Sequence, residues 1–95
     1  YFGGGYAGGY SATVDKFAFS DDSRTTLGTG LSVGRSGSAG MANSGTAGYF
    51  GGGSSATTYS TVDKFAFSDD SRTTLGTGLS TIRKDLAAMA NSGTL

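Results

Sequence analysis

Hydrophobic and polar residues alternate over Val62–Ser68, so that two phenylalanines share one face of the segment and Val62 and Ala66 share the other. An alternation with a period of two is typical of a β-strand. The cluster Ser68–Ser71 follows, and its Ser and Asp side chains favour a turn because they hydrogen-bond to nearby backbone. Arg72–Thr77 is rich in threonine, which favours strands. The pattern therefore predicts a β-hairpin.

This pattern occurs twice along the chain, with an offset of 48 residues. Thr13–Ser32 is identical to Thr61–Ser80, and the sequences YFGGG and MANSGT recur at the same offset. A period of this length indicates a repeat architecture, in which one copy of the repeat cannot bury a core alone. We therefore divide the chain into repeat 1, residues 1–48, and repeat 2, residues 49–95.

The segment before the second YFGGG sequence is predicted to be a strand. Arg83–Ala90 contains helix-favouring residues, but its counterpart Arg35–Ala42 contains two glycines, each of which destabilises a helix by about 1 kcal/mol. One structural role must serve both copies, so we expect a strand in each. Asn43–Gly45 then provides a tight turn, since glycine accepts a positive φ. The predicted unit is a four-stranded antiparallel meander, with strands at Ser38–Ala42, Ala47–Gly51, Thr61–Ser68 and Arg72–Thr77.

The repeat resembles the kelch repeat of β-propellers, and the resemblance covers the whole chain. The matching segments are Leu79–Arg83, which leads to the kelch arginine, Leu86–Ala90 as the innermost strand, Gly48–Gly52 with its double glycine, and Val62–Phe65 as the third strand. Phe65 stands where the family usually has Tyr, and Leu75 where it usually has Trp. The resemblance implies an all-β fold, a β-propeller built of four-stranded antiparallel meander blades with two repeats per chain.

The alternative fold is a β-solenoid or a fibrous stack, which Gly/Ser/Thr-rich repeats also build. A solenoid would need several turns within each repeat, and the sequence has no finer period. Similar Gly-rich repeats resemble those of phage tail or virion proteins and of bacterial surface proteins.

The division of the strands between blades predicts that the chain pairs with a further copy of itself. Residues 1–31 supply strands two to four of one blade, residues 33–80 supply a complete blade, and residues 81–95 supply only the first strand of the next blade. We expect the unmatched strands to pair between chains, in a head-to-tail cyclic oligomer. Propellers have about four to eight blades, and we favour a trimer with six. Further repeats of a longer chain are the alternative partner.

Composition excludes several function classes. Seven Lys and Arg residues balance seven Asp and Glu residues and form no basic stripe, which argues against nucleic-acid binding. No apolar run approaches the roughly 20 residues that span a bilayer, so we expect no membrane insertion. The chain has no His and no Cys, which excludes a Ser-His-Asp or Cys-His arrangement and a thiolate or imidazole metal site. We therefore predict no enzyme, no cofactor and no metal.

The charged residues of the strands have simple structural interpretations. The adjacent carboxylates Asp69 and Asp70, like their counterparts in repeat 1, are interpreted as a solvated hairpin turn. The pairs Asp63–Lys64 and Asp15–Lys16 are interpreted as surface charges. Four phenylalanines are expected in a core between blades, namely Phe17, Phe19, Phe65 and Phe67.

Five residues are candidate ligand-binding residues. Tyr6, Tyr10 and Tyr59 lie in the variable loop between strands two and three, where a rigid scaffold can carry recognition. Arg35 and Arg83 are retained within an otherwise changed segment. They are either hydrogen-bonding anchors between blades or ligand contacts at a central channel.

These observations predict a non-catalytic structural or recognition segment of a β-propeller, on a virion (tail or capsid-associated) or an extracellular surface, with a glycan or a surface protein as its ligand. The alternative is a carbohydrate-binding propeller lectin with repeated weak sites between blades.

Overall fold

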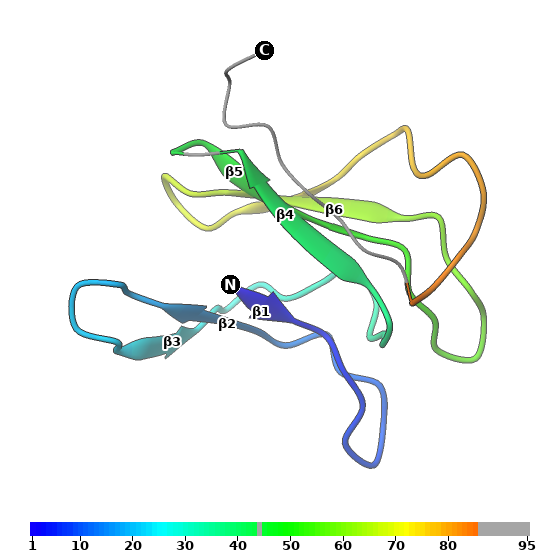
Figure 1. Cartoon of the computed structure of the whole chain (residues 1–95), viewed down its shortest axis with the longest axis horizontal. Helices are drawn as coiled ribbons and strands as arrows, with labels where there is room; N and C mark the ends of the chain where they lie inside the picture. The colour runs from blue at the N-terminus through cyan, green and yellow to red at the C-terminus, as the bar shows by residue number, and fades with distance from the viewer. Residues whose placement is uncertain (44, 86–95) are drawn as a thin grey trace.

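The chain folds into two antiparallel β-sheets in a computed structural model that describes residues 1–43 and 45–85 (Figure 1). The first sheet has the order β1-β2-β3, the second has the order β4-β5-β6-β7, and no helix occurs in the described residues. The strands are β1 Phe2–Gly3, β2 Val14–Phe17, β3 Arg24–Thr26, β4 Ala39–Asn43, β5 Ala47–Gly51, β6 Val62–Ala66 and β7 Arg72–Thr74. The prediction of an all-β fold is thus confirmed for this part of the chain.

The second sheet is the predicted four-stranded meander. β5 has the predicted bounds, β4 begins one residue later than predicted, and β6 and β7 end earlier than predicted. The turn between β4 and β5 contains Gly45, whose φ of 75° is the left-handed conformation expected there. The strand prediction is confirmed over Ala39–Ala42, whereas the predicted strand Leu86–Ala90 lies outside the described residues.

The turn between β6 and β7 is also the predicted one. Asp69 accepts a hydrogen bond from the backbone N–H of Ser71 at 3.0 Å, and Asp70 adopts a φ of 59°. The equivalent turn of the first sheet has the same features at Asp21, Ser23 and Asp22. Identical sequences therefore form identical turns, because short Asp side chains tolerate this conformation and satisfy the backbone locally.

The first sheet lacks an equivalent of β4 among the described residues. β1 pairs with β2 through Phe2↔Asp15 and Gly3↔Val14, whereas the equivalent strand β5 pairs with both β4 and β6. β2 and β3 begin 48 residues before β6 and β7.

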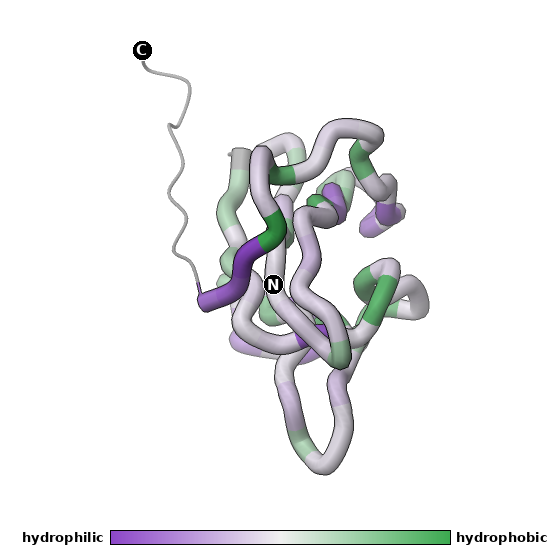
Figure 2. The backbone as a smooth tube through the Cα atoms, turned by 90° about the vertical axis from the view of Figure 1, so that its right-hand side faces the viewer, coloured by the Kyte–Doolittle hydropathy of each residue, from purple (hydrophilic) through white to green (hydrophobic). Residues whose placement is uncertain are grey.

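The core lies where the two sheets meet. Val14 and Leu31 from repeat 1 pack with Phe50 and Phe65, whose rings meet edge to face at 5.9 Å between centroids. Figure 2 shows how short the strongly hydrophobic segments are, since most of the trace is pale. With so little apolar sequence, the fold depends on contact between the sheets.

One glycine is required where the chain passes closest to itself. The N–H of Leu31 donates to the carbonyl of Ala12 at 2.7 Å, and a Cβ on the preceding Gly30 would lie 2.2 Å from that same oxygen. We expect Gly30→Ala to lower the free energy of unfolding by about 1–3 kcal/mol, because the backbone must shift. Gly28→Ala is the matched control, since its Cβ would meet no atom within 4 Å. Its expected effect is within about 0.5 kcal/mol of zero or slightly stabilising, and urea unfolding of the two variants checks the difference.

Candidate functional site

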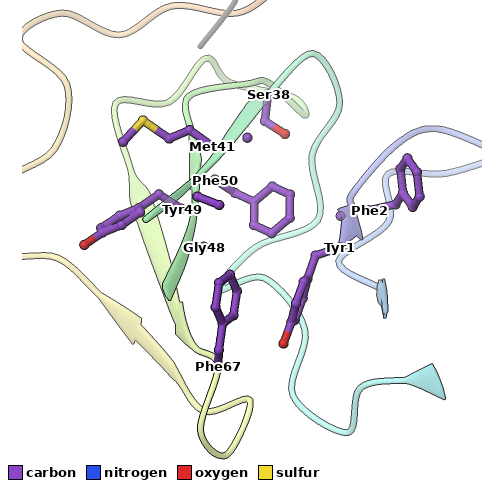
Figure 3. Close-up of a pocket in the computed structure, with 11 residues that line it drawn as sticks. Tyr1, Phe2, Ser38, Met41, Gly48, Tyr49, Phe50 and Phe67 are labelled. Carbon is purple, nitrogen blue, oxygen red and sulfur yellow. The ribbon is translucent and has the colours of Figure 1, made fainter. Parts of the chain in front are cut away.

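A groove lies between β1 of the first sheet and the paired strands β4 and β5 of the second (Figure 3). Its volume of about 420 Å³ lies within the range of about 300–1,000 Å³ that is usual for small-molecule sites. None of the residues that line it is charged. They are Tyr1, Phe2, Gly3, Ser38, Gly40, Met41, Ala42, Gly48, Tyr49, Phe50 and Phe67.

Aromatic rings from both repeats form the wall of this groove. Tyr1 and Phe67 stack with their centroids 5.1 Å apart and their planes at 24°, and Figure 3 shows the two rings side by side. Phe67 passes over Gly48, where a Cβ would lie 3.3 Å from its ring. Such rings offer flat apolar surface, and the Tyr1 hydroxyl adds a polar group at one end.

A polar cluster joins the two sheets beside the stacked rings. Asp70 accepts a hydrogen bond from the Tyr1 hydroxyl and another from the Lys16 ammonium at 2.9 Å. Desolvation and the bond to Asp70 raise the pKa of Tyr1 to about 12. Hydrogen bonds from Tyr1 and Lys16 lower the pKa of Asp70. At neutral pH, Tyr1 is therefore a protonated donor and Asp70 a paired carboxylate, an arrangement that holds the sheets together but leaves no free general base.

A fully buried ion pair lies deeper between the sheets. The Nη2 of Arg35 donates to Asp63 at 3.2 Å and to the carbonyl of Phe50 at 3.4 Å. The Arg35 backbone bonds to the first-sheet loop, because its N–H donates to Ser11 and its carbonyl accepts from Gly5. Arg35 thus links the two sheets, a geometry that agrees with the anchor interpretation, and its side chain is inaccessible to solvent. Its Nε and Nη1 have no partner among the described residues.

The interpretation of Asp63 as a surface charge is wrong, because the residue is completely buried. Burial by itself raises the pKa of Asp63, but hydrogen bonds from Thr74 and Ser32 and the charge of Arg35 outweigh burial and lower that pKa. The carboxylate is therefore ionised and satisfied from three sides. Lys16, also expected at the surface, is half-buried in its ion pair with Asp70.

The lowered pKa values of Asp63 and Asp70 predict that the fold loses stability in acid. A carboxyl whose pKa is lower in the folded than in the unfolded chain contributes stability above its unfolded pKa of about 3.9, and this stability disappears as the pH falls through the folded value. We therefore expect urea midpoints to be constant near neutrality and to fall below about pH 4. Asp70→Asn should remove part of that fall, and a midpoint that stays constant down to pH 2 would contradict the ionised pairs.

The structure brings only two of the predicted tyrosines together. Tyr6 and Tyr10 pair across a small loop, with ring centroids 5.0 Å apart, and both side chains are exposed. Tyr6 also borders a shallow hollow of about 620 Å³ with Phe2 and Asp15. Tyr59 is half-buried in the equivalent loop of repeat 2, where its hydroxyl bonds to Ser55 at 2.8 Å.

The side chain of Arg83 differs in burial from that of Arg35, although the two arginines occupy equivalent positions in the two repeats. Arg83 is exposed, and only its backbone repeats the contacts of Arg35, through Tyr59 and Gly53. The exposed Phe17 and Phe19 likewise depart from the predicted core, unlike the buried Phe65.

Neither a metal cluster nor a membrane-spanning helix occurs in the described part of the chain. No group of three or more His, Cys, Asp or Glu residues there could hold a metal ion. No helix within residues 1–43 and 45–85 is long and apolar enough to cross a bilayer.

Sequence reasoning missed Tyr1, Lys16, Asp63 and Asp70 as site residues. The spacing of 28 residues from Arg35 to Asp63 occurs only once in the chain, so it is no repeated signal for the ion pair. Local sequence gives no signal either, because Asp15 has the same following residues as Asp63. Tyr1 lies in the YFGGG segment, which resembled only a glycine-terminated strand.

In comparisons with protein-family models and with curated proteins, no family model and no curated protein matches this chain.

Proposed function

We propose that the chain is a non-catalytic segment of a β-propeller, in which sheets of four strands stack as blades and serve a structural and recognition role. The observation that carries this proposal is the packing of one sheet on the other through residues of the repeat itself. Arg35, Asp63 and Phe65 all belong to the repeated pattern, and all three are buried at that contact. A contact made by repeated residues can be made again by each further repeat.

The chemistry of the described residues supports a role without catalysis. The carboxylates Asp63 and Asp70 are both occupied by structural partners. The groove carries rings and glycines with no charged side chain. A virion or extracellular surface is the setting we propose, because Gly/Ser/Thr-rich repeats of this kind resemble those of phage tail and bacterial surface proteins.

The shape of a tandem protein tests the propeller. Three copies joined through a single glycine keep the 48-residue offset, because position 48 is also a glycine. We expect such a protein to appear by electron microscopy as a compact disc with a central axis. A rod that lengthens with each added copy would instead support the β-solenoid and overturn the proposal.

Carbohydrate binding is the second candidate function, and the groove between the sheets favours it. The stacked Tyr1 and Phe67 provide the flat aromatic surface that sugar rings pack against. On a glycan array, we expect saturable binding that falls several-fold in Tyr1→Ala and is unchanged in Tyr10→Ala. The reverse pattern would place the site at the loop tyrosines, and no binding across the array would reject this candidate.

A further inference from the structure

The two sheets carry the same phenylalanines but bury only one set of them. Phe50 and Phe65 are 7% and 0% exposed, whereas their equivalents Phe2 and Phe17 are 70% and 41% exposed. Phe67 packs on Tyr1, whereas its equivalent Phe19 is 99% exposed. The local sequences are identical, so the difference arises from the first sheet, which covers this face of the second. No described residue covers the corresponding face of the first sheet.

The opposite face of the second sheet shows the complementary difference. Val14 and Leu31 pack against Phe50 and Phe65 in the core and are buried. Their equivalents in repeat 2, Val62 and Leu79, are only half-buried. Successive residues of a strand point to opposite faces, so Val62 faces away from the side that Asp63 and Phe65 present to the first sheet. The second sheet thus presents again the surface that the first sheet uses inside the chain.

Charged residues differ between the two sheets in the same way as the apolar ones: they are paired where the sheets meet, and their equivalents on the outer faces form no ion pair with any described residue. Arg35 pairs with Asp63, and the positions one repeat away from them in the outward directions are Arg83 and Asp15. Asp15 accepts a hydrogen bond from Thr26 at 2.6 Å, as Asp63 does from Thr74, but no Lys or Arg of the described residues lies within 4.0 Å of it. The unused cation lies on the second-sheet side and the unused carboxylate on the first-sheet side.

Lys64 and Asp22 are a second pair of opposite charges whose equivalents, Lys16 and Asp70, form an ion pair within the chain. Lys64 lies 5.9 Å from the ring centre of Tyr49, the same arrangement that Lys16 has with Tyr1. Lys16 and Tyr1 are joined by Asp70, whose equivalent is the exposed Asp22 on the first sheet. Lys64 and Tyr49 have no such carboxylate among their described contacts.

We infer that the second-sheet face, made of Tyr49, Val62, Lys64, Leu79 and Arg83, binds the first-sheet face of a second copy of this chain, made of Phe2, Asp15, Phe17, Phe19 and Asp22. Arg83 pairs with Asp15 of the second copy, and Lys64 with its Asp22. Because the two faces differ, the contact is head to tail and is repeated until rotation closes a ring. This inference rests on the proposed stacking of repeats and adds its partner and its residues.

Charge reversal tests the contact on the full chain. We expect the wild type to form a discrete oligomer by light scattering and analytical ultracentrifugation. Arg83→Asp or Asp15→Arg should weaken assembly at least tenfold, because each places like charges opposite one another. The double variant carrying both substitutions restores an opposite pair, and we expect its assembly within about threefold of the wild type. Circular dichroism should be unchanged in each variant, since neither side chain forms an ion pair between the two sheets of one chain.

Three results would overturn the inference: a folded wild type that remains monomeric, single variants that assemble like the wild type, or a double variant that fails to recover. The tandem protein separates this failure from that of the proposed function. A monomeric chain whose joined copies still form a disc would reject self-association and leave the propeller intact, whereas a rod would reject the propeller.

Discussion

Arg35→Met is expected to cause one of the two largest losses of stability, about 3–5 kcal/mol, because it leaves the Asp63 carboxylate buried without its cation. Methionine fills much of the same space, so the loss reports charge more than packing. A domain of this size is stable by only about 5–15 kcal/mol, and the variant should therefore unfold at markedly lower urea concentration. The measurement is equilibrium urea unfolding followed by circular dichroism.

Two further variants separate charge from other effects. Lys84→Met removes an exposed cation from the equivalent segment of repeat 2, which follows β7, and we expect it to change the unfolding free energy by no more than about 0.5 kcal/mol. Adding Asp63→Asn to Arg35→Met removes the unpaired charge and should recover part of the loss. A double variant as unstable as the sum of the two single variants would show that the pair is not coupled.

Phe65→Ala is the second large effect, with an expected loss of about 3–5 kcal/mol, because the ring is fully buried among Val14, Leu31 and Phe50. The matched control is Phe17→Ala, which changes the same residue in the same local sequence on the uncovered sheet. Both should be measured in the Arg83→Asp background, in which we expect no second copy to cover Phe17.

Phe17→Ala should lower the free energy of unfolding by less than half as much as Phe65→Ala does. Equal losses would mean that the two phenylalanines are equally buried and that the sheets do not stack as described. The comparison thus measures what the neighbouring sheet contributes at one position.

Local sequence was enough to predict the strands and turns. Alternation located β6, the Ser-Asp cluster located the turn before β7, and comparison of the two copies rejected a helix at Arg35–Ala42. These features depend on neighbouring residues along the chain, which the sequence displays directly.

Burial could not be predicted in the same way, because it depends on which sheet lies opposite. Asp15 and Asp63 have identical neighbours along the chain, and only Asp63 faces a sheet that excludes water. For the same reason Phe19 and Phe67 were given one role although their surroundings differ. The contact of Tyr1 with Asp70 spans 69 positions and has no local signature.

The measurement that tests the stacking of the two repeats most directly is a nuclear Overhauser spectrum of the folded chain. We predict cross-peaks between the Tyr1 and Phe67 rings and between the Phe50 ring and the Val14 methyl groups, which join repeat 1 to repeat 2. If each repeat instead gives only internal cross-peaks, the sheets do not pack on one another, and the stacking from which the function and the partner are inferred is wrong.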